Sequence, residues 1–223
     1  MTMSRFAEDG ASRLSSALPS DLLAALPADA ALDDDSAGSR DLLSQPWCAE
    51  LVAPIRRRLY AIGALAEDAV AIQCTLFRKT ATCNWKAPYH QDLSVPVAVR
   101  IEHPDLSGWS TKPDGLYVQP PETLLSKLLA VRLHLDACGE DDGPLRVVPG
   151  SHRSGRLPST TIADVPKSAV ERTCVAERGD LWLMRPLLLH ASSRAARPNG
   201  RRVLHFVFAP PDPGHGLQWR IAV

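Results

Sequence analysis

The sequence predicts a β-rich fold, a barrel or sandwich of strands with helices packed on its outside. Segments in which apolar residues alternate with other residues outnumber helical segments from residue 69 onward, which favours sheets. The apolar fraction of 45% is enough for a substantial core, and a chain of 223 residues fits one unit of this kind. We therefore expect a single domain, with a helical N-terminal region at 1–68, a β core at 69–210 and a tail at 211–223.

The composition narrows the classes of function. The formal net charge is zero, which gives no electrostatic reason to bind nucleic acid or an anionic membrane. The five cysteines are scattered, with no C-x-x-C pair, a pattern typical of a reducing compartment rather than of a disulfide framework or a zinc site. Glu8, Asp9, Asp21 and Pro27 interrupt the apolar residues of the first segment, so we expect no signal peptide, no membrane-spanning helix and a cytoplasmic protein.

The N-terminal region is expected to be helical in two places. Pro19-Ser20-Asp21 precedes a run of leucines and alanines, which predicts a short capped helix that ends at Pro27. The acidic run from Asp29 to Ser39 is typical of a loop. Between Pro46 and Ala66 apolar residues recur at helical spacing, and the three arginines at 56–58 fall between them, as on a solvated face.

Strands are expected throughout the core. The clearest lie at 70–76, 129–136, 145–148, 181–184 (with 187–190 running on from it) and 201–208. In the second of these, alternation places Arg132, His134 and Asp136 on one face and apolar residues on the other. His205, in the last strand, shares an inward face in the same way. We interpret His134 and His205 as core histidines rather than ligands.

Two long stretches are predicted to be loops. Residues 101–121 contain two glycines and four prolines, and a loop of this length in a compact domain is commonly a lid over a site. The candidate lid residues that shape a substrate pocket are Trp109, Lys112 and Tyr117. One helical turn is expected at 121–125, and the second loop covers 154–174.

One stretch carries candidate metal ligands. In Pro88-Tyr89-His90-Gln91-Asp92-Leu93 an imidazole and a carboxylate stand two residues apart. Residues i and i+2 of an extended strand point to the same face, so His90 and Asp92 converge while Gln91 turns away. They are two-thirds of the facial 2-His-1-carboxylate arrangement that holds ferrous iron with open positions. His190, at the end of a distant strand, is the expected third ligand.

The order of the motifs resembles the phytanoyl-CoA dioxygenase family. The matching blocks are His90-x-Asp92, Gly143-Pro144-Leu145-Arg146-Val147-Val148-Pro149-Gly150-Ser151-His152, Gly179-Asp180, His190-Ala191-Ser192 and Arg201. They lie between residues 70 and 210, and the Pro-Gly-Ser-His block is more specific than the His-x-Asp pair. The resemblance implies a double-stranded β-helix, the jelly-roll or cupin-like fold, and an oxygenase that depends on iron(II) and 2-oxoglutarate.

The resemblance also implies roles for single residues. The catalytic iron ligands are expected to be His90, Asp92 and His190, which leave positions for 2-oxoglutarate and O2. Arg201 matches the arginine that pairs with the far carboxylate of 2-oxoglutarate, a task suited to the guanidinium fork. Ser192 matches a hydroxyl that assists the same carboxylate. Arg202 points to the opposite strand face, so we expect a surface or packing role for it.

Three further residues are weaker candidates for the cosubstrate pocket. Arg132 lies on an inward strand face where relatives often carry an aromatic residue. Contact with 2-oxoglutarate, recognition of an acidic substrate and a salt bridge to a buried carboxylate all stay open for it. Lys79 and Asn84, just before the His-x-Asp pair, are candidates for ordering the same pocket.

The remaining histidines have no predicted catalytic role. His152, in the Pro-Gly-Ser-His block, is expected to tether a turn. His103 and His215 fall in predicted loops, and the sequence names no partner for either.

The implied reaction is the decarboxylation of 2-oxoglutarate to succinate and carbon dioxide, coupled to oxidation of an aliphatic C–H bond. Because Asp92 stands where related halogenases have a small residue, hydroxylation, desaturation or cyclisation is favoured over halogenation. A small molecule, for example of secondary metabolism, is the expected substrate. Two alternatives stay open: a cupin-like binding or regulatory protein without turnover, and a metal-dependent cupin enzyme that uses no 2-oxoglutarate. The complete ligand set opposes the first, and Arg201 with Ser192 opposes the second.

Overall fold

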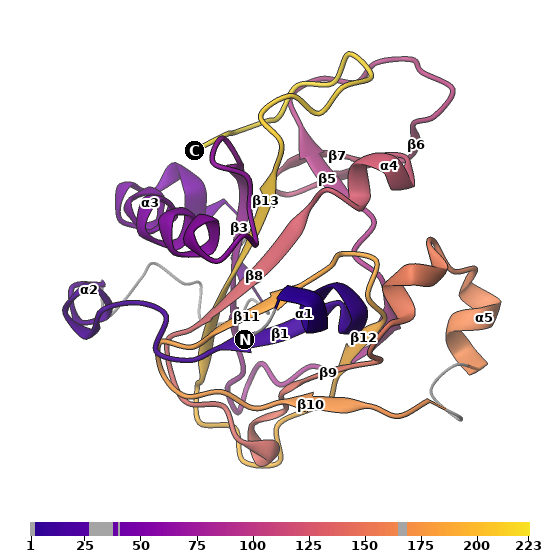
Figure 1. The fold of residues 1–223 in the computed structure, drawn as a ribbon. Helices are drawn as coiled ribbons and strands as arrows, with labels where there is room; N and C mark the ends of the chain where they lie inside the picture. Colours follow the sequence, from indigo (N-terminus) through magenta and orange to yellow (C-terminus); the bar gives the residue numbers. More distant parts are fainter. Residues whose placement is uncertain (1–2, 27–37, 40, 165–168) are drawn as a thin grey trace.

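The computed structural model describes residues 3–26, 38–39, 41–164 and 169–223, and its strands form three antiparallel sheets (Figure 1). The main sheet has six strands in the order β1-β11-β8-β13-β3-β2. Their bounds are β1 (Ala11–Leu14), β2 (Gly38–Ser39), β3 (Val70–Arg78), β8 (Leu129–His134), β11 (Leu181–Met184) and β13 (Arg202–Ala209).

Two smaller sheets complete the β core, in the orders β10-β9-β12-β4 and β5-β7-β6. Their strands are β4 (Ala87–His90), β5 (Val95–Val97), β6 (Ser107–Lys112), β7 (Gly115–Gln119), β9 (Leu145–Val147), β10 (Arg172–Cys174) and β12 (His190–Ser192). The chain leaves the main sheet for the four-stranded sheet after β3, β8 and β11, and it returns for β11 and β13. This exchange between facing sheets confirms the predicted mainly β fold with a jelly-roll core.

Helices lie outside the main sheet, as predicted (Figure 1). The elements before the core are α1 (Met3–Asp9), α2 (Ser20–Ala24), the 3-10 turn η1 (Leu42–Ser44) and α3 (Pro46–Ala61). In α3 the residues Leu51, Ile55 and Leu59 repeat every four positions and pack with strands of the main sheet in one apolar core. Of the three arginines, Arg57 and Arg58 are exposed, whereas Arg56 donates to the carbonyl of Ala69 at 3.3 Å.

Shorter helical elements follow within the core. They are α4 (Glu122–Leu125), η2 (Glu140–Asp142), η3 (Ser151–Ser154) and α5 (Ser159–Asp164). The helical turn expected at 121–125 is therefore present as α4. The capping expected for α2 is absent, because Pro19 occupies the N-cap position and no side chain caps the helix. None of the described helices has both the length and the apolar character needed to cross a membrane.

The central strands of the main sheet separate an apolar face from a polar one. Residues such as Leu76, Val131 and Phe206 belong to the core that the helices cover. On the opposite face, Thr75 of β3 pairs with His205 of β13, which in turn pairs with Arg132 of β8. Because side chains alternate along each strand, the residues that build the core leave a polar row across three strands on the inner face.

The prediction of a loop at 101–121 is wrong, because most of this segment forms the β6–β7 hairpin. The glycines that suggested a loop have local roles in this hairpin. Gly115 (φ +137°) follows the turn at Pro113-Asp114, and Gly108 (φ +58°) lies at a register shift between Ser107 and Ser110. The hairpin pairs with β5, so most of the segment belongs to the three-stranded sheet, and its role as a lid over the site stays a prediction.

Three other expectations differ from the structure. The loop predicted at 154–174 contains α5 and β10. The strand predicted at 181–184 is present as β11, but 187–190 does not run on from it as a strand, because Pro186 opens a turn before β12 begins at His190. The first residues do more than pack outside the core, since β1 pairs with β11 at the edge of the main sheet. Of the loop predicted at 29–39, all but the two residues of β2 lie outside the described residues.

Candidate metal centre

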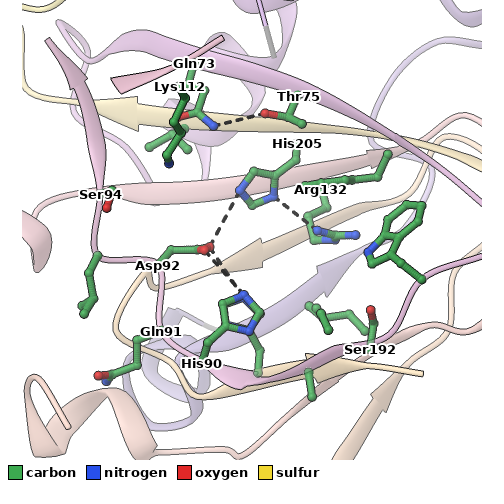
Figure 2. Close-up of a pocket in the computed structure, with 18 of the residues that line it drawn as sticks. Gln73, Thr75, His90, Gln91, Asp92, Ser94, Lys112, Arg132, Ser192 and His205 are labelled. Atoms are coloured by element: carbon green, nitrogen blue, oxygen red, sulfur yellow. Dashed lines mark hydrogen bonds and ion pairs between the residues drawn. The ribbon is translucent and has the colours of Figure 1, made fainter. Parts of the chain in front are cut away.

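Two facing strand ends and the loop after one of them bring His90, Asp92 and His190 together; we refer to these residues as the pocket triad. His90 ends β4, His190 begins β12, and the two are direct cross-strand partners with ring centroids 4.2 Å apart. Nε2 of His90 lies 3.9 Å from Oδ1 of Asp92, and Nε2 of His190 lies 3.6 Å from Oδ2. The carboxylate therefore faces both imidazoles, and Figure 2 shows Asp92 directed towards the labelled His90.

Asp92 lies beside the two imidazoles, but it is not on the same strand as His90, where strand alternation had placed it. β4 ends at His90, and Asp92 lies in the following loop, where its N–H donates to the carbonyl of Pro186 at 2.9 Å. Gln91 turns away, as expected. Its amide donates to the carbonyls of Gly155 and Leu187 at 2.8 and 2.6 Å and so fixes the loop on both sides.

Backbone carbonyls set the tautomer of both histidines. Nδ1 of His90 lies 2.7 Å from the carbonyl of Pro88, and Nδ1 of His190 lies 2.8 Å from that of Leu188. A carbonyl can only accept, so each Nδ1 carries the proton and each Nε2 presents its lone pair towards Asp92. Hydrogen bonds of this kind orient histidines that bind metals.

Electrostatics keeps the triad in the form that binds a cation. Burial lowers the pKa of His190, which leaves this imidazole neutral at pH 7. Burial acts to raise the pKa of Asp92, but the neighbouring imidazoles of His190, His205 and His90 outweigh it and hold the pKa below its usual value. Two imidazole nitrogens and one carboxylate on one side of an open space fit a ferrous ion.

The triad faces a cavity of about 350 Å³ to which all three sheets contribute. The four-stranded sheet contributes His90, His190 and Ser192, and the main sheet contributes Gln73, Thr75, Phe77, Arg132, His205 and Val207. The β6–β7 hairpin contributes Lys112 and Tyr117. Among the described residues that line the cavity, Asp92 is the one carboxylate, whereas several lining residues are cationic.

Three of these cations, Lys79, Arg132 and Arg201, are buried. Nε and Nη2 of Arg201 donate to the carbonyls of Asp142 and Gly143 at 3.0 and 2.7 Å. Nζ of Lys79 donates to the same Gly143 carbonyl at 3.1 Å and to that of Ser193. In the described part of the chain, none of the three cations forms an ion pair with a carboxylate. Buried cations without anionic partners are costly, so this arrangement favours an anionic ligand.

The shifts of pKa record the same crowding of positive charge. Burial, followed by the charge of Arg201, lowers the pKa of Lys79 to about 8. Burial and again Arg201 lower the pKa of Arg132 to about 10. Each positive charge therefore disfavours the charged form of its neighbours. An anion bound among the three side chains would offset this repulsion.

His205 belongs to the cavity and not, as expected, to the closed core. Its Nδ1 lies 3.4 Å from Nη1 of Arg132, and its Nε2 lies 3.9 Å from Oδ2 of Asp92 (Figure 2). Arg132 can only donate, so Nδ1 of His205 accepts and the Nε2 proton faces the carboxylate. Burial and the charge of Arg132 lower the pKa of His205 to about 3, so it is a neutral link between the two residues.

The other predicted residues are divided between the cavity and its surroundings. Ser192 lines the cavity, and its hydroxyl lies 3.4 Å from Nζ of Lys79. Asn84 lies outside the lining, where it exchanges hydrogen bonds of 2.9 and 2.8 Å with the backbone of Ala195. Arg202 forms an ion pair with Asp136, away from Arg201.

Some predicted contacts with the cavity are absent. Lys112 and Tyr117 line it, whereas Trp109 packs on the apolar core behind the hairpin, with Arg100 over its ring. His134 is buried outside the lining, as expected of a core histidine. His152 lies 3.1 Å from the carbonyl of Ala7 and so ties its turn to the N-terminal segment.

Sequence reasoning could have ranked Lys79 higher, but it could not have assigned His205 to the cavity. Alternation along β3 and beyond it places Gln73, Thr75, Phe77 and Lys79 in the same lining. His205 is one strand away from Arg132, in direct register. The missing information was the pairing of β13 with β8 and β3, which a single sequence does not show.

Comparisons with known proteins add evidence on family and fold. The family model of phytanoyl-CoA dioxygenase matches residues 6–203. None of the curated proteins compared with the chain matches it. Among solved structures, EctD from S. alaskensis with 2-oxoglutarate and 5-hydroxyectoine is 18% identical, with a TM-score of 0.65, and the match covers 92% of this chain and 74% of that one.

Two further proteins have solved structures with the same fold. HygX from Streptomyces hygroscopicus with iron bound is 18% identical, with a TM-score of 0.65 and coverage of 94% of this chain and 85% of that one. A second structure of HygX holds nickel and 2-oxoglutarate. The non-heme alpha ketoglutarate dependent epimerase SnoN, from nogalamycin biosynthesis, is 14% identical, with a TM-score of 0.66 and coverage of 96% and 85%.

Proposed function

Because the chain belongs to the phytanoyl-CoA dioxygenase family, we propose that it is an oxygenase that uses iron(II), 2-oxoglutarate and O2 to oxidise an aliphatic C–H bond of a small molecule. One observation carries this proposal. The pocket triad and three buried cations without carboxylate partners among the described residues face the same cavity. The first group suits a ferrous ion, and the second suits a dianionic cosubstrate.

The pocket triad is the proposed iron site. Nε2 of His90, a carboxylate oxygen of Asp92 and Nε2 of His190 are the ligand atoms, held in place by the carbonyls of Pro88 and Leu188. A centre of this kind supplies the activation of O2 that couples decarboxylation of 2-oxoglutarate to oxidation of the substrate. The carboxylate of Asp92 fills a position that a halide would need, so hydroxylation, desaturation or cyclisation is the proposed outcome.

Arg201, Lys79 and Ser192 form the proposed site for the far carboxylate of 2-oxoglutarate. Nη1 of Arg201 makes no hydrogen bond within the described residues, and its other two nitrogens are fixed on carbonyls. The guanidinium is therefore oriented before the ligand arrives, which lowers the entropic cost of binding. Lys79 adds a second charge beside the Ser192 hydroxyl.

Arg132 has an electrostatic role in the proposal. A salt bridge to a buried carboxylate, one of the three roles considered, is absent within the described residues. Its charge lies between His205, which faces Asp92, and the Arg201 side of the cavity, where it lowers the cost of holding an anion. The substrate is proposed to bind on the remaining wall, where the β6–β7 hairpin presents Lys112 and Tyr117.

The test uses the intact protein without O2. Ferrous iron is added first and 2-oxoglutarate second, and the weak visible charge-transfer band of the chelate is recorded. We expect a band that needs both components and that is lost in Asp92→Ala. The control is Asp136→Asn, which removes a carboxylate paired with Arg202 outside the cavity and should leave the band unchanged.

Each outcome separates the proposal from its alternatives. A band with normal controls supports a search for the substrate by release of succinate. Iron that binds without a band overturns the role of 2-oxoglutarate and favours the cupin enzyme that does not use it. Failure to bind iron at all overturns the metal site and favours a binding protein without turnover.

A further inference from the structure

A second cluster of two imidazoles and one carboxylate lies outside the cavity, formed by His103, Asp105 and His215; we refer to it as the surface triad. Oδ2 of Asp105 lies 3.9 Å from Nδ1 of His103 and 3.8 Å from Nδ1 of His215. The two rings meet edge to face with centroids 5.0 Å apart. All three side chains are partly exposed, and none of them lines the cavity.

Two backbone turns hold the surface triad together. One turn is closed by the N–H of Leu106 on the carbonyl of His103 at 3.1 Å, and the other by the N–H of Leu217 on that of Gly214 at 2.9 Å. The first precedes β6 and the second belongs to the C-terminal segment. Leu106 and Leu217 are buried in one apolar cluster, so both turns are anchored from below.

The backbone at His215 is unusual. His215 has φ of +55°, one of two non-glycine residues with positive φ in the described part of the chain, and it stands between Gly214 (+72°) and Gly216 (+73°). A side chain in this region is strained and persists where the surroundings hold it. Here the two glycines allow a tight left-handed turn that directs the imidazole to Asp105.

The ligand atoms are arranged for a metal as well as those of the pocket triad. The separations of 3.8 and 3.9 Å match the 3.6 and 3.9 Å of the pocket triad. The N–H of Asp105 donates to Nδ1 of His103 at 3.2 Å, so this nitrogen is unprotonated, and a metal on its single lone pair would replace this long hydrogen bond. Two imidazoles and one carboxylate are ligands that zinc, nickel and copper accept.

We propose that the surface triad binds a divalent transition-metal ion of the zinc class, with water completing its coordination. The ion joins the loop before β6 to the C-terminal segment, which are far apart in sequence. It thereby fixes the outer side of the sheet whose strands present Lys112 and Tyr117 to the cavity. The site is independent of the iron and 2-oxoglutarate proposed for the cavity.

The experiment counts zinc ions bound by the metal-free intact protein, by titration against a coloured chelator. The wild type is expected to bind two equivalents, because the pocket triad also accepts zinc. His215→Asn is expected to bind one. Asparagine tolerates the left-handed conformation, so this variant removes the ligand and keeps the turn. His103→Gln should lose the same equivalent.

Controls separate the two sites. His190→Asn should lose the other equivalent, and the double variant His190→Asn/His215→Asn should bind none. His152→Gln removes an imidazole outside both triads and should keep two. Zinc should raise the midpoint of thermal unfolding of His190→Asn but not of the double variant.

Two equivalents in His215→Asn, or one wild-type equivalent that only His190→Asn removes, would overturn the surface site. One wild-type equivalent that only His215→Asn and His103→Gln remove would support it and instead count against metal binding in the cavity.

Discussion

The pocket triad and the surface triad have the same ligand types at similar spacing, but they differ in the groups around the ligands. In the cavity, carbonyls of Pro88 and Leu188 fix both imidazoles, and buried cations line the same cavity as the carboxylate. At the surface, one imidazole nitrogen accepts from a backbone N–H, and all three side chains are partly exposed, as His90 and Asp92 are, whereas His190 is buried. The comparison teaches that the two sites share a metal-ligand set, whereas the cavity adds the neighbouring positive charge that an anionic cosubstrate needs.

The largest expected effect is the loss of iron from the cavity in His190→Ala. Loss of a residue that only orients a ligand typically costs 10- to 100-fold in metal affinity, so loss of the ligand itself should cost at least about 100-fold. The measurement is the anaerobic dissociation constant for ferrous iron, with circular dichroism to confirm folding. An equal loss of iron affinity in His215→Asn would contradict the separation of the two sites, since the surface triad should not affect iron in the cavity.

Next in size is the effect of Arg201→Ala on 2-oxoglutarate. Removal of a buried charge that pairs with a carboxylate typically costs 2–5 kcal/mol, so the dissociation constant should rise about 100-fold while iron binding stays near wild type. The matched control is Arg202→Ala, whose partner Asp136 lies outside the cavity. Equal loss of iron and 2-oxoglutarate in Arg201→Ala would contradict the assigned role.

A pair of glycines tests the wall of the cavity. Gly143 and Gly214 both have positive φ, at +63° and +72°. A Cβ on Gly143 would lie 2.6 Å from the carbonyl oxygen of Ser193 and 2.9 Å from Nζ of Lys79, whereas one on Gly214 meets nothing within 4 Å. Gly143→Ala should therefore lower the free energy of unfolding by about 2–4 kcal/mol, and Gly214→Ala by about 1 kcal/mol. Similar losses, measured by denaturant unfolding, would mean that the backbone at Gly143 yields easily.

The smallest expected effect is the pH dependence that Lys79 gives to 2-oxoglutarate binding. Its pKa of about 8 means that the ammonium is charged below pH 8 and neutral above it. A bound dianion favours the charged form, so the dissociation constant should rise about fivefold between pH 7 and 9. Nickel replaces iron in this measurement to avoid oxidation, since a structure of HygX holds nickel with 2-oxoglutarate.

The same lysine affects stability with the opposite sign. Its pKa is lower in the folded protein than in the unfolded chain, so the unfolded chain binds more protons between pH 8 and about 10. The free energy of unfolding without ligand should therefore rise with pH in this window. Lys79→Met should abolish both trends, and the exposed Lys86→Met should keep them. A flat binding profile in the wild type would exclude Lys79 from the cosubstrate site.

Much of the fold was predictable because alternation and helical spacing are local patterns that a single sequence shows. Alternation along 129–134 placed Arg132 on the inner face correctly, and helical spacing placed α3 on the outside. The hairpin at β6–β7 was missed because Gly108 and Gly115 are typical of loops as well as of bulges and hairpin turns. The division of the chain at residues 68 and 210 stays a prediction.

The site was predictable only in part, for a different reason. His90 and Asp92 stand close in sequence, and the family resemblance supplied His190 and Arg201. The contacts of His205 with Arg132 and of His103 with His215 depend on which distant segments pair, and no local pattern carries that information. The surface triad joins Asp105 to His103 and His215, the two histidines for which the sequence named no partner.

The pairing of β4 with β12 also has a consequence for how the chain folds. His90 lies on the edge strand β4 and pairs with His190 on the inner strand β12, yet a hundred positions of sequence separate them. Closing so long a loop is entropically costly and slow, so this pairing is expected late in folding. The two imidazoles meet only when this pairing forms, so the rate at which a metal ion binds in the cavity would report the rate of the last step of refolding. A bound ion would also stabilise the β4–β12 pairing once it has formed.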